Sequence, residues 1–201
     1  MKNYNRKIVK NKIPFVSICL ATYNMEKYIE STILSIINQS FQDFEIIILN
    51  DNSKDNTENI VNRLILNDKR IKIINHSKNL GLYASRVDGF LNSKGKYTIL
   101  MDPDDMLINP ALLSNLYNLI SKFNLDIIEY KMYIYNEKKK YLYIDHNRIH
   151  YHHFNSKIII QPELSNLHFY KEGTKIYSGV ICTSLRNFIV RRDILLIFSF
   201  N

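Results

Sequence analysis

The 201-residue chain has no tryptophan and only two cysteines, five glycines and four prolines. So little glycine and proline excludes a collagen-like or low-complexity chain, and 46% hydrophobic with 23% charged residues is typical of a folded soluble domain. The cysteines, Cys19 and Cys182, lie far apart and lack the close spacing of a metal site. We interpret them as core thiols of a protein in a reducing compartment.

The chain also lacks a long apolar run. No stretch reaches the ~18 residues that a membrane-spanning helix requires. The apolar segment 13–21 is interrupted by Pro14 and Ser17, so it makes a poor signal peptide and is better explained as the start of a strand. These features predict a cytoplasmic protein and leave a peripheral association with the membrane surface open.

Negative charge is scarce at the N-terminus, although the chain as a whole carries a formal net charge of +8. Five basic residues and no acidic residue precede Pro14, and a second basic run occupies 138–140. No predicted helix carries a continuous basic stripe, and no nucleic-acid-binding motif is present. We therefore interpret the basic residues as a solvated tail and a surface loop, and expect no nucleic-acid partner.

Four strand-like apolar segments alternate with four segments that repeat apolar residues at helical spacing. The expected strands are 15–21, 44–49, 71–74 and 97–101, and the expected helices begin near Asn24, Asp55, Tyr83 and Asn109. This alternation predicts an α/β fold with a mostly parallel sheet and helices on both faces. Ligands of such sheets bind at the carboxyl ends of the strands, so the polar residues that follow each strand are candidate site residues.

The pattern changes after Leu125. The segment 126–144 predicts a strand pair that turns around 136–140, and the sequence RNFIVRRDILLIF predicts a strand followed by the start of a helix. Residues 145–175 show no periodicity that we can interpret.

Acidic and small polar residues follow the four expected strands. Three carboxylates arrive within four positions at Asp102, Asp104 and Asp105, where their mutual repulsion requires a compensating positive charge. Hard cations such as Mg²⁺ or Mn²⁺ prefer carboxylate and phosphate oxygens, so a metal-bound nucleotide diphosphate fits this set. Taken singly, the residues have plainer explanations: the acidic run could cap a helix, and Asp51 could lie in a turn.

The stretches VSICLATYN, FEIIILNDNSKDNT, NLGLYASRVDGF and GKYTILMDPDD resemble, in order and spacing, the successive signature blocks of family 2 glycosyltransferases. A Rossmann dehydrogenase, the alternative for this fold class, requires a GxGxxG motif after its first strand. This chain has ATYN there, which argues against a dehydrogenase. The resemblance implies a GT-A (Rossmann-like) fold and transfer of a sugar, with inversion, from a nucleotide-sugar donor. It also implies Mn²⁺ or Mg²⁺ as cofactor, and by family frequency a UDP-linked donor.

The resemblance assigns the nucleotide-binding residues position by position. Thr22 and Tyr23 would line the base pocket, Asp51 would bind the nucleobase, and Arg86 would lie near the base or the diphosphate. Alone, Arg86 could equally be a surface arginine of a helix.

The resemblance also assigns the acidic run. Asp104 would contact the ribose or the metal, Asp105 would ligate the metal, and Asp102 would support them. Two departures from the family pattern occur beside Asp51, because Asn50 and Asn52 stand where aspartate and glycine are common.

The resemblance divides the chain into a basic tail, 1–13, and a GT-A domain, 14–201. Residues 14–125 form the nucleotide-sugar-binding half, and 126–201 form an acceptor-side half that we expect to be incomplete. The general base of the family is a carboxylate after a segment like NFIVRRDIL, and no match to its motif follows here. Two hypotheses remain: an active transferase with a glycan, lipid-linked or protein acceptor, or a truncated, inactive nucleotide-sugar-binding module.

Overall fold

The computed structural model describes residues 13–130, 133–136, 141–144, 167–170 and 188–193. The basic tail up to residue 12, the basic run at 138–140 and Cys182 lie outside the described residues. Within the described part, no helix is both long enough and apolar enough to cross a membrane.

The predicted alternation of strands and helices is confirmed. The first part of the chain contains β1 (Val16–Thr22), α1 (Ile29–Ile37), β2 (Phe44–Asn50), α2 (Thr57–Asn67), β3 (Ile71–Asn75), α3 (Leu82–Asn92), β4 (Tyr97–Met101) and α4 (Leu112–Phe123). The remaining described strands are β5 (Ile127–Tyr130), β6 (Tyr133–Asn136), β7 (Tyr141–Ile144), β8 (Leu167–Tyr170) and β9 (Phe188–Arg191).

The strands form a mixed seven-stranded sheet in the order β3-β2-β1-β4-β9-β5-β8. The pairs β3–β2, β2–β1 and β1–β4 are parallel, whereas β9 runs antiparallel to both β4 and β5. Strands β6 and β7 form a separate antiparallel pair, which confirms the strand pair predicted around 136–140. Strand β9 likewise confirms the strand predicted in RNFIVRR.

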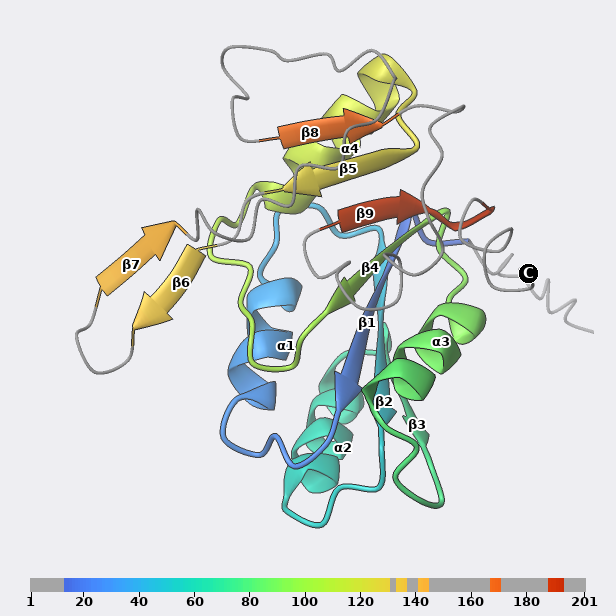
Figure 1. The fold of residues 1–201 in the computed structure, drawn as a ribbon, viewed down its shortest axis with the longest axis vertical. Helices are drawn as coiled ribbons and strands as arrows, with labels where there is room; N and C mark the ends of the chain where they lie inside the picture. The colour runs from blue at the N-terminus through green and yellow to red at the C-terminus, as the bar shows by residue number, and fades with distance from the viewer. Residues whose placement is uncertain (1–12, 131–132, 137–140, 145–166, 171–187, 194–201) are drawn as a thin grey trace, which may run out of the picture.

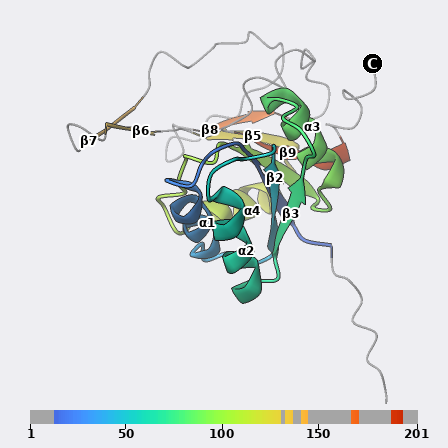
Figure 2. The same cartoon turned by 90° about the horizontal axis from the view of Figure 1, so that it is seen from below.

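Helices cover both faces of the sheet (Figures 1 and 2). Helices α1, α2 and α4 pack their apolar sides on one face, where they form the larger core with β1, β2 and β4. Helix α3 covers the other face over a smaller core that includes Cys19, Leu49 and Phe90. Because both faces are covered, β1 and β2 are buried along their whole length, which explains their lack of polar alternation.

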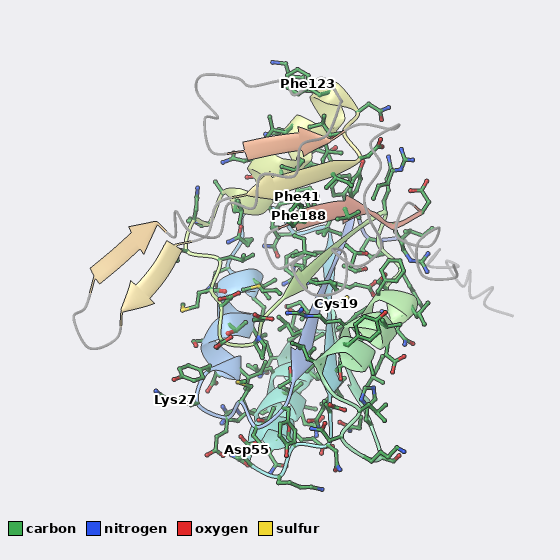
Figure 3. The ribbon with its side chains drawn as sticks, in the orientation of Figure 1. Cys19, Lys27, Phe41, Asp55, Phe123 and Phe188 are labelled. Atoms are coloured by element: carbon green, nitrogen blue, oxygen red, sulfur yellow. The ribbon has the colours of Figure 1, made fainter. Side chains whose placement is uncertain are left out.

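Cys19 lies between the sheet and α3 (Figure 3), where its thiol donates to the carbonyl oxygen of Gly89 at 3.3 Å. Burial raises the pKa of this thiol far above its ordinary value. A Cβ atom at Gly89 would lie 2.7 Å from Leu49 Cδ2 and 3.2 Å from Cys19 Cβ. The absence of a side chain at Gly89 therefore lets α3 approach the sheet closely, and the prediction of a core thiol at Cys19 is confirmed.

A buried carboxylate fastens the amino ends of the strands. Glu45 accepts hydrogen bonds from Ser17 Oγ at 2.7 Å, from the backbone nitrogen of Lys94 at 2.7 Å and from Lys72 Nζ at 2.6 Å. Burial alone would raise the pKa of Glu45, but these hydrogen bonds and the Lys72 charge outweigh it and lower the pKa. Glu45 thus holds β2, β1, β3 and the turn before β4 together.

We predict that Glu45→Gln lowers the free energy of unfolding at neutral pH by about 1–3 kcal/mol, because a charged acceptor is lost while its buried donors remain. Since the folded-state pKa of Glu45 is depressed, its stabilisation is complete above the ordinary pKa of 4.5 and is lost as the pH falls through the folded-state pKa. Urea denaturation at several pH values should show that the free energy of unfolding falls less steeply with decreasing pH in the variant than in the wild type. The same pH dependence in both proteins would contradict the role given to Glu45. Ser121→Ala, on the exposed side of α4, is the control.

Candidate functional site

The parallel pairing brings four strand ends to one edge of the sheet, at the lower end of Figure 1. In the register, Thr22 lies opposite Asn50, and Asn50 lies opposite Asn75. A cleft of about 450 Å³ opens at this edge. Its described lining consists of Ala21, Thr22, Tyr23, Met25, Asp51, Asn79, Gly81, Leu82, Ser85, Asp102, Pro103 and Asp104. Four of the six predicted site residues therefore meet in one cleft, whereas Arg86 and Asp105 are not among its described lining residues.

Hydrogen bonds fasten the loop after β1 to the loop after β2. Asn24 Oδ1 accepts from the backbone nitrogen of Lys54 at 2.8 Å. The backbone nitrogen of Glu26 donates to Asp55 Oδ2 at 3.0 Å, and Glu26 Oε2 accepts from the backbone nitrogen of Asn56 at 2.8 Å. Figure 3 shows Asp55 at this end of the molecule. The two loops therefore form one rigid margin of the cleft.

Asn24 does not begin the first helix as predicted. It adopts a left-handed φ of 52°, and α1 begins five residues later at Ile29. Asparagine tolerates this conformation because its short polar side chain hydrogen-bonds locally. The prediction that Asn24 caps the first helix was wrong, because its side chain accepts a hydrogen bond from the neighbouring loop instead.

The two departures beside Asp51 have structural explanations. Asn52 has a φ of 61°, a left-handed conformation that glycine adopts without strain and asparagine tolerates. Asn50 donates from Nδ2 to Asn75 Oδ1 at 2.9 Å and accepts from the backbone nitrogen of Ser53 at 3.2 Å. An amide can make both bonds, whereas an ionised aspartate could only accept.

Asp51 is buried at the base of the cleft, and the loop after β3 wraps around its carboxylate. Oδ1 accepts from the backbone nitrogen of Leu80, and Oδ2 accepts from that of Gly81, both at 2.8 Å. His76 Nδ1 lies 2.8 Å from Oδ1. Burial alone would raise the pKa of Asp51, but these hydrogen bonds lower it below its ordinary value. Asp51 is therefore an ionised acceptor at neutral pH.

The acidic loop after β4 is joined to α3 by an ion pair. Arg86 Nη2 donates to Asp102 Oδ1 at 2.5 Å, and the Arg86 side chain is only 8% exposed. The backbone nitrogen of Asp105 donates to the carbonyl oxygen of Asp102 at 3.1 Å, which closes a turn. Arg86 therefore neutralises the first carboxylate of the run, and the turn projects Asp104 into the cleft. A direct role of Arg86 at the base or diphosphate stays a prediction.

The acidic loop has the donor atoms that a hard cation requires. Asp102 and Asp104 line the cleft, and Asp105 follows directly in the same turn. Among the described residues, no three acidic, histidine or cysteine side chains gather as a complete metal set. Mg²⁺ and similar ions are commonly held by one or two carboxylates together with substrate phosphates and water. The residues present therefore fit a cation that arrives with a phosphorylated ligand.

A polar row on α1 holds the backbone of the acidic loop, a feature that our sequence analysis missed. Thr32 Oγ1 donates to the carbonyl oxygen of Pro103 at 2.8 Å, and Ser35 Oγ accepts from the backbone nitrogen of Leu107 at 3.0 Å. Thr32 is fully buried. Thr32 and Ser35 are three residues apart and so share one side of α1, next to its apolar face. This spacing was the only feature of the sequence that could have indicated their role.

Gln39, two residues after the end of α1, adds to the support given by Thr32 and Ser35. Its Nε2 donates to the carbonyl oxygens of Leu107 at 3.3 Å and Asn109 at 3.0 Å, and its Oε1 accepts from the backbone nitrogen of Leu113 at 3.2 Å. Leu113 lies in the first turn of α4, whose backbone N–H groups have no partner within the helix. Gln39 thus fixes both the loop and the start of the next helix.

We predict that Thr32→Val, which keeps the shape of the side chain, lowers the free energy of unfolding by about 1–3 kcal/mol because the buried Pro103 carbonyl loses its donor. Ser31→Ala is the matched control, since the Ser31 hydroxyl donates to a backbone carbonyl of the same helix at the exposed surface. Chemical denaturation of both variants measures the difference. Equal effects of the two substitutions would show that the Thr32 hydroxyl does not anchor the loop.

Comparisons with known proteins agree with this geometry. The sequence model described as "Glycosyl transferase family 2" matches residues 17–195. An uncharacterized glycosyltransferase of Haemophilus influenzae is 38% identical over 100 residues, which cover 50% of this chain and 40% of that protein. The GalNAc(5)-diNAcBac-PP-undecaprenol beta-1,3-glucosyltransferase of Campylobacter jejuni is 36% identical over 101 residues, 50% of this chain and 33% of that protein.

Solved structures show the same fold. TarS 1–349 of S. aureus in complex with UDP-GlcNAc superposes with a TM-score of 0.64 at 22% identity, covering 92% of this chain and 47% of that chain. The mannosyltransferase PcManGT of Pyrobaculum calidifontis, in complex with GDP-Man and Mn²⁺, gives a TM-score of 0.53 at 17% identity, covering 58% and 35%.

The chain spans about a third to a half of the length of the curated relatives that it matches. The match to the family sequence model extends over most of the chain and includes every described strand and helix from α1 to β9. The mixed sheet, its helices and these similarities establish a GT-A fold. The chain belongs to glycosyl transferase family 2.

Proposed function

We propose that this chain binds a nucleotide-sugar and belongs to an inverting glycosyltransferase that moves the sugar from a UDP-linked donor to an acceptor hydroxyl. The observation that carries the proposal is the meeting of Asp51, Asp102 and Asp104 in one cleft at the carboxyl ends of parallel strands. Asp51, an ionised acceptor at one side of the cleft, would suit the base of a nucleotide diphosphate. The acidic loop at the other side would suit its metal-bound diphosphate.

The base-binding end lies at Asp51, Thr22 and Tyr23. Asp51 would accept from a ring N–H of the base. The Tyr23 side chain is 44% exposed at the cleft, so its ring is available to stack on a flat base. Thr22 donates from Oγ1 to the carbonyl oxygen of Leu20 at 3.2 Å, so it would shape the pocket wall.

The diphosphate end lies at the acidic loop. Asp104 and Asp105 would hold Mn²⁺ or Mg²⁺ together with diphosphate oxygens, and the presence of Mn²⁺ in the Pyrobaculum complex supports this choice. The bound ion would neutralise the departing nucleotide diphosphate. Arg86 neutralises Asp102 and holds it in place, and Asp104 lines the cleft beside it.

Inversion requires a carboxylate that takes the proton of the attacking hydroxyl on the face opposite the nucleotide. Among the described residues, the cleft-lining carboxylates are Asp51, Asp102 and Asp104, and each already has a place at the nucleotide side. The base therefore stays unassigned. A chain that binds the donor without transferring sugar is the alternative, and a transfer assay after donor binding is shown separates the two.

The acceptor is a glycan, a lipid-linked sugar or a protein. The name of the Campylobacter relative specifies an undecaprenol-linked acceptor, which favours the lipid-linked class. Such an acceptor would bring the chain to the membrane surface from the cytoplasmic side.

We predict that UDP with Mn²⁺ raises the melting temperature of the chain, and that neither Mn²⁺ alone nor UDP alone gives the full effect. At 100 times its dissociation constant a ligand adds about 2.7 kcal/mol of stability. For a chain of this size, that is a rise of roughly 5–10 °C. Asp104→Asn and Asp105→Asn should abolish the Mn²⁺-dependent part, because each removes a proposed metal ligand.

Glu30→Gln is the control, since Glu30 forms an exposed ion pair with Arg63 on the outer side of α1. GDP, dTDP and CDP are measured in parallel. A folded wild-type chain that shows no shift with any of these nucleotides, with or without Mn²⁺, would overturn the proposed donor site.

A further inference from the structure

A buried histidine stands behind the base-binding carboxylate, and sequence reasoning gave it no role. His76 follows β3, and its side chain is only 8% exposed. Its Nδ1 lies 2.8 Å from Asp51 Oδ1, and its Nε2 lies 3.2 Å from Asp88 Oδ2 on α3. The imidazole ring thus lies between two carboxylates that come from different elements.

The hydrogen on Nδ1 follows from the chemistry of its partner. An ionised carboxylate only accepts hydrogen bonds, so His76 must donate to Asp51 from Nδ1. Asp88 Oδ2 on α3 lies 3.2 Å from Nε2, but this contact lacks the geometry of a hydrogen bond. The bond to Asp51 is therefore the contact that fixes the ring.

The Asp51 carboxylate has about four acceptor positions, two on each oxygen. Leu80 and His76 occupy those of Oδ1, and Gly81 occupies one of Oδ2. One acceptor position remains, on Oδ2, and Asp51 lines the cleft. The three donors therefore fix the rotation of the carboxylate and leave a single direction for a ligand N–H.

We propose that His76 is a positioning residue that holds Asp51 so that its remaining acceptor position selects a nucleotide base with a ring N–H, such as uracil, over one without it, such as cytosine. This inference rests on the proposed function, because Asp51 must be the base-binding residue. Uracil carries a hydrogen on N3, whereas N3 of cytosine is itself an acceptor and would face the carboxylate unpaired. A site built around one hydrogen bond rejects the analogue that lacks its partner.

His76 also shapes the cleft wall. Asp51 draws the Leu80 and Gly81 amides inward, and Gly81 has a φ of 86°, a conformation that side chains strongly disfavour. If Asp51 turned away, the Leu80 amide would lose its acceptor, and the Gly81 amide would keep only Asn79 Oδ1, which lies at 3.1 Å. The loop amides therefore report on the position of Asp51 without any ligand.

The first experiment measures binding of UDP and CDP, with Mn²⁺, to wild type, His76→Leu and His76→Asn. Asparagine places an amide N–H close to the position of Nδ1, whereas leucine keeps the bulk and removes the donor. We expect His76→Leu to weaken UDP binding by about tenfold or more, and to reduce the preference for UDP over CDP. His76→Asn should keep the preference. A folded His76→Leu protein with the wild-type preference, or an Asn variant as defective as the Leu variant, would overturn the proposal.

The second experiment measures amide hydrogen exchange at Leu80 and Gly81 in the ligand-free proteins. We expect exchange in His76→Leu to rise by about tenfold at Leu80 and by less at Gly81, whose amide also donates to Asn79 Oδ1, while amides in the buried β2 keep their protection. Equal exchange in all proteins would overturn the positioning role. This measurement tests the positioning role even if the wild type binds no nucleotide. Absence of nucleotide binding would refute the proposed function, not the positioning role.

His76→Gln serves where His76→Leu does not fold, because glutamine keeps a polar side chain but carries its amide N–H beyond the position of Nδ1. We expect exchange at Leu80 to rise as in His76→Leu. Unchanged exchange in a folded His76→Gln protein would overturn the positioning role.

Discussion

The parallel pairing of β1 with both β2 and β4 is the constraint on which the rest of the structure depends. Parallel strands send all their following loops to one edge, and the helices that return the chain must cover the faces. The cleft is a direct result, because its polar lining comes from loops that are distant in sequence and meet only at this edge. Glu45 supports the same arrangement from the opposite edge, where it gathers the starts of the strands.

Loops that gather at one edge bring backbone groups that need hydrogen-bonding partners. Here side chains provide many of them: Asn24 holds the second loop, Thr32 and Gln39 hold the acidic loop, and Asp51 holds the loop after β3. Residues of the cleft therefore stabilise the fold as well as present chemistry. Asp51 shows this most clearly, since most of its acceptor capacity is used by the protein itself.

The sequence predicted the first four strands, the mostly parallel sheet and the meeting of Asp51 with Asp104, because these depend on local periodicity and on one rule about strand ends. It did not predict β8, which lies in the stretch 145–175 where no periodicity could be interpreted. It did not predict the roles of Thr32, Gln39 and His76. Their partners lie about 25 to 74 residues away along the chain, as between His76 and Asp51 or between Gln39 and Leu113. Helical or strand periodicity describes only near neighbours, so contacts of this kind become visible only once the elements are packed.

Among the described helices, α3 is the one that covers this face of the sheet, and it contacts residues at both ends of the cleft. Arg86 pairs with the acidic loop, and Asp88, two residues later, contacts the histidine behind Asp51. Gly89 lets this helix pack closely on Leu49. The two ends of the cleft therefore share one helix as a common support, so the placement of α3 on the sheet sets the position of both.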